Sequence, residues 1–188
     1  MARTNRELDR DQKREEILRA ARELFLEHGY EGTSMQRLAA RVKVAPNTLY
    51  WYFADKDALL IGVMKRVVQA GLGEYERRRG TALDAQVRWM LGLFWETRTL
   101  IATVHNRAQV SSEVRAWHDT AHRMIEKAIE AELRSRGLAN GHEVAAARIM
   151  SFIAEGVVAH QSSKAEQTRI VRLLMHLLRL DVDDGALR

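Results

Sequence analysis

The segment from Thr33 to Lys56, TSMQRLAARVKVAPNTLYWYFADK, constrains the fold of this chain more than any other stretch. Thr33 and Ser34 offer hydroxyl N-caps, and apolar residues then recur at helical spacing as far as Val42. A break follows, and Pro46 stands where a second helix would start, a position at which the missing N–H costs nothing. The pattern predicts two short helices joined by a tight turn.

The second of these helices has two chemically different sides. One side is apolar and is expected to face a core: Leu49, Tyr52 and Phe53. The other side offers a proline, an amide and two aromatic rings to a partner: Pro46, Asn47, Tyr50 and Trp51. The segment also has an excess of cations over its single acid, Asp55: Arg37, Arg41, Lys43 and Lys56. A helix-turn-helix with a positive face places its second helix in the major groove of DNA.

The preceding sequence completes a small three-helix head. Residues 11–28 carry apolar side chains at the spacing of one helix face, and Gly29 supplies a left-handed stop. We expect the three helices to pack around a shared apolar core: Leu24, Phe25, Leu38, Leu49 and Phe53.

The run ILRAARELFLEHGYEGTSMQRLAARVKVAPNTLYWYFADKDALL resembles the N-terminal domain of TetR-type bacterial transcriptional regulators, over about residues 13–60. Two positions depart from that pattern. Lys43 stands at the turn position where glycine is usual, so a residue with a Cβ must carry any positive φ. Ala45 stands where serine commonly caps the second helix, so that cap is missing.

The head is expected to contact DNA through ten residues. We expect Asn47, with Ala45 and Pro46 beside it, to meet base edges. Hydroxyl, aromatic and cationic side chains around it should hold phosphates: Thr33, Ser34, Tyr50, Trp51 and Lys56. Arg37 and Thr48 complete the predicted DNA-binding set.

Composition agrees with a helical protein that has a polyanionic partner. Of 188 residues, 46% are apolar and one is proline, which suits long packed helices. The formal charge of +5 and the pI near 9.8 favour a polyanion, although they would also suit RNA or a membrane surface. The absence of cysteine excludes disulfides, thiolate nucleophiles and cysteine metal sites. No signal peptide and no apolar run of about 20 residues is found, so we expect a cytoplasmic protein without membrane contact.

Beyond the head, helical patterns continue to the C-terminus. They predict helices over residues 56–79, 81–104, 113–136, 140–160 and 164–180, with a short element near 106–110. The expected fold is therefore all-α with about nine helices. We expect a DNA-binding domain over residues 1–55, with its helix-turn-helix at 34–53, and a ligand-binding and dimerisation domain over residues 56–188.

The last two helices carry the signature of a homodimer. Residues 140–160 are rich in alanine and glycine, and residues 164–180 are apolar over more than one stripe, which requires cover on more than one side. A second copy of the chain is one cover, and the chain's own core is the other. The resemblance implies pairing through these helices, with predicted interface residues Phe152, Ala159, Val171, Leu174, Leu177 and Leu178.

The middle helices concentrate large and polar-tipped side chains where such regulators bind an inducer. The predicted pocket residues are Trp89, Met90, Phe94, Trp117, His118, His122 and Phe152. Stripes of this kind also form plain core, and the sequence does not identify the ligand.

His118 and His122 stand at i and i+4, the spacing that zinc-binding helices use. An enzyme would add His105 or His160 as third ligand and Asp119 as base. Against this, Asp is shorter than the Glu that reaches a metal-bound water, and no third ligand follows at a fixed interval. The histidines then line a pocket or serve the structure. We expect no catalytic residue, no metal and no cofactor.

The resemblance implies a ligand-responsive transcriptional regulator: a homodimeric repressor that a small-molecule inducer releases from a near-palindromic double-stranded DNA operator. Two alternatives stay open. One is a metal-dependent enzyme that uses His118 and His122, and the other is a constitutive DNA binder without a ligand switch.

Overall fold

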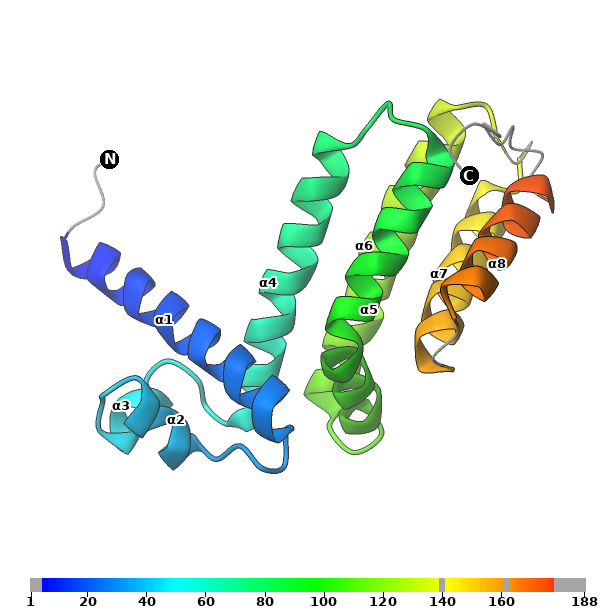
Figure 1. The fold of residues 1–188 in the computed structure, drawn as a ribbon. Coiled ribbons are helices and arrows are strands. Elements are labelled where there is room, and N and C mark those ends of the chain that lie inside the picture. The colour runs from blue at the N-terminus through cyan, green and yellow to red at the C-terminus, as the bar shows by residue number, and fades with distance from the viewer. Residues whose placement is uncertain (1–4, 139–140, 161–162, 178–188) are drawn as a thin grey trace. The chain divides into compact units, whose positions relative to one another are not determined.

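The structure, a computed structural model, describes residues 5–138, 141–160 and 163–177. This part of the chain contains eight helices and no strand (Figure 1). In chain order they are α1 (Asn5–His28), α2 (Met35–Arg41), α3 (Pro46–Tyr50), α4 (Lys56–Arg77), α5 (Leu83–Ala108), α6 (Ser112–Ser135), α7 (Glu143–Ala159) and α8 (Lys164–Leu177). The predicted all-α class is confirmed. One helix fewer is found than expected because α5 runs on through most of the element predicted near residues 106–110.

The chain forms two compact units whose boundaries lie inside α4, α5 and α6. The first unit comprises Met1–Gln69 and Thr99–His118, and the second comprises Ala70–Arg98 and Asp119–Arg188. The predicted domain boundary lies at residue 56. The first unit also holds the beginning of α4 and the segment that connects α5 to α6.

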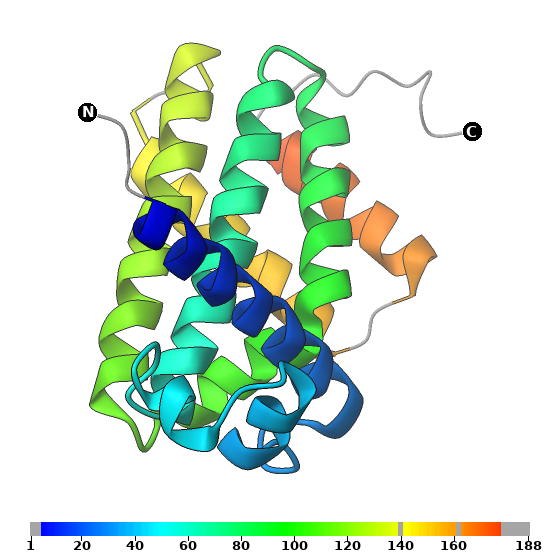
Figure 2. The same ribbon diagram turned by 90° about the vertical axis from the view of Figure 1, so that its left-hand side faces the viewer.

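In the first unit, α2 lies beside α3 and also beside the C-terminal part of α1 (Figures 1 and 2). α1 starts earlier than the predicted residue 11 and ends before Gly29, whose φ of 70° is one that a residue without a Cβ adopts readily. α2 starts at its predicted cap, since Ser34 Oγ accepts a hydrogen bond from the Arg37 backbone N–H at 3.1 Å. The local sequence signals therefore set the helix ends.

The core of the first unit fixes the orientation of α3. The five residues predicted to share this core are all buried, and they pack with residues of α4, α5 and α6 that belong to the same unit: Leu59, Leu60, Val63, Leu100, Val104 and Val114. α4 comes close at Gly62, where an added Cβ would lie 2.8 Å from Leu18 and 2.9 Å from Phe53. This packing holds the short helix α3, which at five residues could not form alone.

The second unit has its own core, to which α7 and α8 both contribute. The smooth face of α7 is buried through Ala146, Ala147 and Ala154. α8 lies beside α7 (Figure 1) and buries Val171, Leu174 and Met175.

This packing corrects part of the predicted dimer interface. Val171 and Leu174 are 4% and 5% exposed, so their side chains already fill the core of their own unit and are not available to a second chain. Phe152 and Ala159 are exposed. The side chain of Leu177 and the residue Leu178 lie outside the described part of the chain.

Candidate nucleic-acid interface

The turn between α2 and α3 has the predicted geometry without its usual residues. Lys43 has φ of 54°, so the left-handed turn position is occupied by a residue with a Cβ. Ala45, extended at φ −66° and ψ 144°, caps α3 without a side-chain hydrogen bond, and Pro46 takes the first helical position. Both departures from the family pattern therefore leave the helix-turn-helix intact.

The strained turn gives a stability prediction. Lys43→Gly should raise the free energy of unfolding by about 0.5–1 kcal/mol, because glycine adopts positive φ without a steric penalty. Lys43→Ala is the matched control, since it removes the same charge but keeps a Cβ in the left-handed region. Urea unfolding followed by circular dichroism measures both variants. Equal stability of the two variants would show that the turn carries no strain.

The outer side of α3 is open to solvent, as predicted. Leu49 is fully buried beneath it, whereas Pro46, Asn47 and Tyr50 are exposed and Trp51 is 83% exposed. Ala45 is exposed before the helix, and Thr48 is half-buried. An exposed indole on a well-packed scaffold has no role in the core of this chain, so this surface is available to a partner.

Exposed cations flank α3. Arg37 and Lys43 are exposed, and one Arg37 guanidinium nitrogen donates to the Gly32 carbonyl at 2.8 Å. Arg41 pairs with Glu23 at 3.1 Å, with both side chains about half exposed. Exposed ion pairs of this kind contribute little to stability, so these cations can exchange their partners for phosphate oxygens at low cost.

The prediction that Thr33 holds a phosphate is corrected by its burial. Thr33 is 1% exposed, and its Oγ1–H is shared between the Leu24 carbonyl at 3.1 Å and the Gly29 carbonyl at 2.8 Å. The hydroxyl ties the end of α1 to the start of α2 instead of facing a ligand. Ser34, its exposed neighbour, remains at the surface as the N-cap.

The phosphate role predicted for Lys56 is corrected in the same way. Its Nζ donates to the Tyr30 carbonyl at 2.8 Å, lies 4.1 Å from the centroid of the Tyr30 ring and is 3.6 Å from Glu31 Oε2. These contacts turn the ammonium group toward the chain itself. Lys56 therefore fastens the start of α4 to the loop that follows α1.

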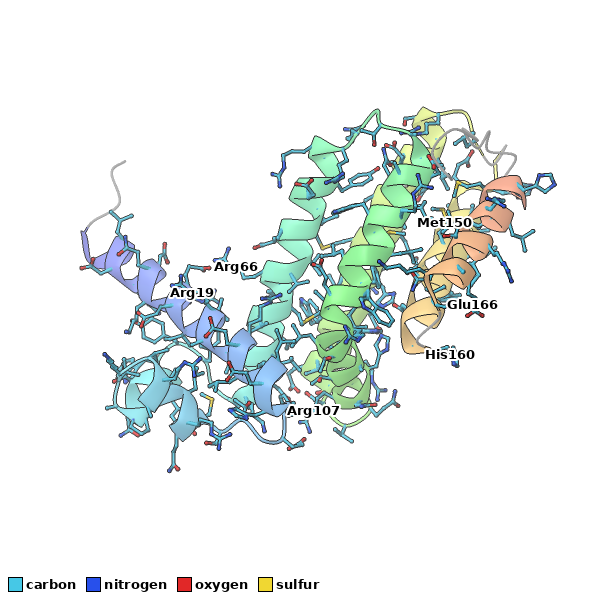
Figure 3. All side chains as sticks on the ribbon, viewed as in Figure 1. Arg19, Arg66, Arg107, Met150, His160 and Glu166 are labelled. Carbon is cyan, nitrogen blue, oxygen red and sulfur yellow. The ribbon has the colours of Figure 1, made fainter. Side chains whose placement is uncertain are left out.

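A polar cluster that the sequence analysis did not predict connects the start of α4 to the end of α5 and to the loop after α1. Asp57 on α4 receives two hydrogen bonds from Arg107, at 3.0 Å and 2.7 Å, and another from the Tyr30 hydroxyl. The Arg107 guanidinium also lies 5.1 Å from the centroid of the Tyr30 ring; Figure 3 labels this arginine at the end of α5. Fifty residues separate Asp57 from Arg107, so no local pattern could have joined them.

The electrostatics of this cluster favour a charged Asp57. Burial alone would raise the pKa of Asp57, but hydrogen bonds from Arg107, Tyr30 and Ser111 outweigh it and hold the pKa below its ordinary value. Burial and the Asp57 carboxylate raise the pKa of the Tyr30 hydroxyl. As an anion, the carboxylate therefore joins α4 and α5 to the loop that follows α1.

The predicted pocket residues divide between the two units. Met90 and Phe94 pack against the core of the second unit, where Arg78 lies 5.3 Å from the centroid of the Trp89 ring. Trp117 packs against the core of the first unit. Phe152 is 60% exposed. The role of these residues in a pocket stays a prediction.

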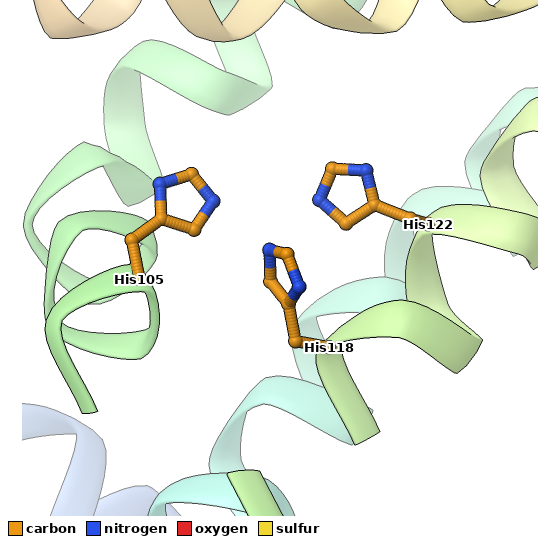
Figure 4. Close-up of side chains that lie close together, drawn as sticks. All are labelled: His105, His118 and His122. Atoms are coloured by element: carbon orange, nitrogen blue, oxygen red, sulfur yellow. The ribbon is translucent and has the colours of Figure 1, made fainter. Parts of the chain in front are cut away.

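The predicted histidines have partners within each unit. In the first unit, the His118 ring meets the His105 ring edge to face, with 4.9 Å between centroids (Figure 4). In the second unit, His122 Nε2 lies 2.9 Å from Glu155 Oε1. Hydrogen bonding to Glu155 outweighs burial and raises the pKa of His122.

In the described part of the chain, no helix has the length and apolar character needed to cross a membrane.

Comparison with known proteins finds relatives of the N-terminal residues. Residues 17–63 match the bacterial regulatory proteins of the tetR family. The transcriptional repressor AcnR of Corynebacterium diphtheriae is 38% identical over 53 residues, which is 28% of each chain. The transcriptional activator FasR of Mycolicibacterium smegmatis is 36% identical over 81 residues, or 43% of this chain and 37% of FasR. These matches thus span only about a third of the curated relatives.

The fold is shared over a longer stretch than the sequence. The structure of Salmonella enterica GusR superposes with a TM-score of 0.73 at 23% identity, covering 89% of this chain and 96% of that one. The two named curated relatives are transcriptional regulators, one a repressor and one an activator. The match to the tetR family of bacterial regulatory proteins covers residues 17–63, which lie within the first unit.

Proposed function

We propose that this protein is a DNA-binding transcriptional regulator whose recognition helix is α3. The observation that carries the proposal is the exposed side of α3, which presents Asn47, Tyr50 and Trp51 above a fully buried Leu49. A short helix held this way by a packed scaffold suits insertion into the major groove. The match of residues 17–63 to the tetR family supports the same function.

The side chains around α3 suit different parts of DNA. Asn47 can donate to and accept from a base edge at once, as in bidentate contacts to adenine. Tyr50, Trp51, Ser34 and Arg37 are exposed, and we expect them to contact the sugar–phosphate backbone. The net charge of +5 adds a general attraction to the polyanion.

We further propose that two copies act together through α7 and α8. These helices expose large apolar side chains although each contributes to a buried core: Val144, Ile149, Phe152 and Leu173. A surface of this kind on one unit suits a self-complementary contact with a second copy. Two recognition helices would then read a near-palindromic operator, with half-sites spaced by about one helical turn.

The dimer proposal predicts monomers from one exposed substitution. Phe152→Glu should dissociate the dimer, because it places a charge in a contact that would otherwise be apolar, and it should leave the fold intact because Phe152 is exposed in the single chain. Met124→Glu, an exposed apolar residue of α6 in the same unit, is the control and should stay dimeric. Sedimentation velocity measures both, and a dimeric Phe152→Glu would place the interface elsewhere.

The proposed regulation is repression relieved by a small-molecule inducer. AcnR is a repressor and FasR an activator, so likeness to them leaves the direction of control open. The family resemblance favours an inducer bound by the body, with differential affinity for the two states as the source of the switch. A constitutive binder would hold its operator equally well with every compound tested.

Selection from a random DNA pool tests the function itself. Full-length protein should enrich a two-fold symmetric motif over several rounds, and binding should weaken steeply with added salt because phosphate contacts release counterions. An unenriched pool after the same rounds would contradict sequence-specific binding.

A further inference from the structure

Arg41, the last residue of α2, lies beside two carboxylates of the neighbouring helix α1. Its Nη2 atom is 3.1 Å from Glu23 Oε2 and 3.7 Å from Glu27 Oε1. All three side chains are about half exposed, so water and other ions reach the contact. The two helices belong to the first unit and pack against each other (Figure 2). The chain itself therefore supplies the anions that Arg41 contacts.

Arg41 also belongs to a polar stripe along α2. Ser34, Arg37 and Arg41 follow one another at intervals of three and four residues, which places them on one face of the helix. All three residues are exposed. In a helix-turn-helix bound to DNA, the first helix crosses the sugar–phosphate backbone. Since α2 is the first helix of this helix-turn-helix, DNA phosphates are suitable partners for the whole stripe.

The charges on the two helices form two pairs of like sign. Arg37 and Arg41 are four residues apart on α2, and Glu23 and Glu27 are four residues apart on α1. Like charges at this spacing destabilise a helix. A phosphate beside Arg37 and Arg41 would compensate the pair on α2 but would leave the two carboxylates of α1 without the cation that they share. Binding of Arg41 to a phosphate therefore competes with its binding to Glu23 and Glu27.

We propose that Arg41 is a phosphate-binding residue and that Glu23 and Glu27 weaken DNA binding because they occupy Arg41 in the free protein. This rests on the proposed DNA-binding function and adds to it an internal competitor of the DNA phosphates. The effect is the same for every DNA sequence, because phosphates carry no base identity. Arg41 thus sets the affinity for DNA in general, whereas the bases are read by α3.

The salt dependence of DNA binding tests the role of Arg41. Binding of the full-length protein to its selected operator and to a random-sequence duplex is followed by fluorescence anisotropy over a series of salt concentrations. Arg41→Ala should weaken both complexes and lower the slope of log K against log salt by about 0.9 for each chain. Arg41→Lys keeps the charge and should keep the slope. An unchanged slope in Arg41→Ala would overturn the phosphate role.

Arg66→Ala is the matched control. Arg66 of α4 also pairs with a carboxylate of α1, that of Glu15, and both side chains are about half exposed. Because Arg66 is not on α2, its removal should leave the salt slope of both complexes as in the wild type. The same loss of slope in Arg66→Ala and in Arg41→Ala would show a general effect of lost positive charge and would overturn the assignment to Arg41.

Glu23→Gln combined with Glu27→Gln tests the internal competition. This double variant keeps the size of both side chains and should tighten binding to both duplexes by about 1.5-fold to 5-fold for each chain, the fold-change that corresponds to an exposed ion pair. In the Arg41→Ala background the gain should largely disappear, because the three side chains act through one contact. An equal gain in both backgrounds would be a general effect of removing negative charge and would overturn the competition.

Two outcomes separate this inference from the function on which it rests. A wild-type protein that binds neither duplex would overturn the DNA-binding function and the phosphate role together. A wild-type protein that binds its operator, with an Arg41→Ala variant of the same affinity and salt slope, would overturn the phosphate role alone. Circular dichroism of each variant should match the wild type, since the substituted side chains are about half exposed.

Discussion

Asp57→Asn should lower the free energy of unfolding by about 2–4 kcal/mol, because it leaves the Arg107 guanidinium without its anion in a mostly buried position. The substitution keeps the size of the side chain, so packing changes little. The two bonds from Arg107 and the one from Tyr30 all end on this carboxylate. Urea unfolding followed by circular dichroism measures the loss.

Glu15→Gln is the matched control. The Glu15 carboxylate pairs with Arg66, again joining residues of the first unit that are distant in sequence, but both side chains are about half exposed. Solvent screens this pair, so its removal should cost less than about 1 kcal/mol. If Asp57→Asn lowered the free energy of unfolding no more than Glu15→Gln does, the Asp57 cluster would not stabilise the first unit.

The pH dependence of the free energy of unfolding in acid gives an independent check of the role of Asp57. The pKa of Asp57 is lower in the folded protein than its ordinary value, so the stability that this group supplies is complete above the unfolded pKa of about 4. It is lost as pH falls through the folded value. The stability difference between wild type and Asp57→Asn should therefore stay constant from neutral pH to about pH 5 and shrink below about pH 4.

Tyr50→Ala combined with Trp51→Ala should weaken operator binding by about 30-fold or more, since buried aromatic anchors are typically worth about 2 kcal/mol or more at an interface. Both rings are exposed in the free protein, so the double variant should unfold at the same urea concentration as the wild type. Fluorescence anisotropy with the selected DNA motif measures the affinity.

Val110→Ala controls for the loss of exposed apolar surface. Val110 is 74% exposed in the same unit but lies in the connection between α5 and α6 instead of on α3. Its removal should leave DNA affinity within about twofold of the wild type. An equal loss in Val110→Ala and in the aromatic double variant would remove α3 from the interface.

Local sequence signals were sufficient for the helix-turn-helix. Ser34, Pro46 and the apolar spacing of α2 and α3 each act within a few residues, and the structure confirms the cap, the helix start and the buried Leu49. Even the unusual Lys43 was identifiable, because the turn requires a positive φ whatever residue occupies it.

Side chains with tertiary partners could not be assigned in this way. Thr33 and Lys56 stand at positions suited to phosphates, but the end of α1 and the loop after it supply nearer acceptors. A carbonyl that the fold brings close leaves no trace in the spacing of residues. The same reason hid the contact of Arg107 with Asp57.

The sequence showed that α8 carries more apolar residues than a single buried stripe needs. It did not show which of them are buried in the core of their own unit. Val171 and Leu174 pack inside their own unit, whereas Leu173 between them is exposed. Both arrangements satisfy the same composition, and the packing of the second unit decides which stripe is covered.

Asn47→Ala, taken through the same DNA selection as the wild type, tests the central claim that α3 reads bases. Asn47 is exposed at the start of α3, so the variant should fold normally. The wild type should enrich a symmetric motif, and Asn47→Ala should enrich a motif that has lost its preference at one position in each half-site. An identical motif from both proteins, at equal affinity, would contradict base reading by Asn47 at the start of α3.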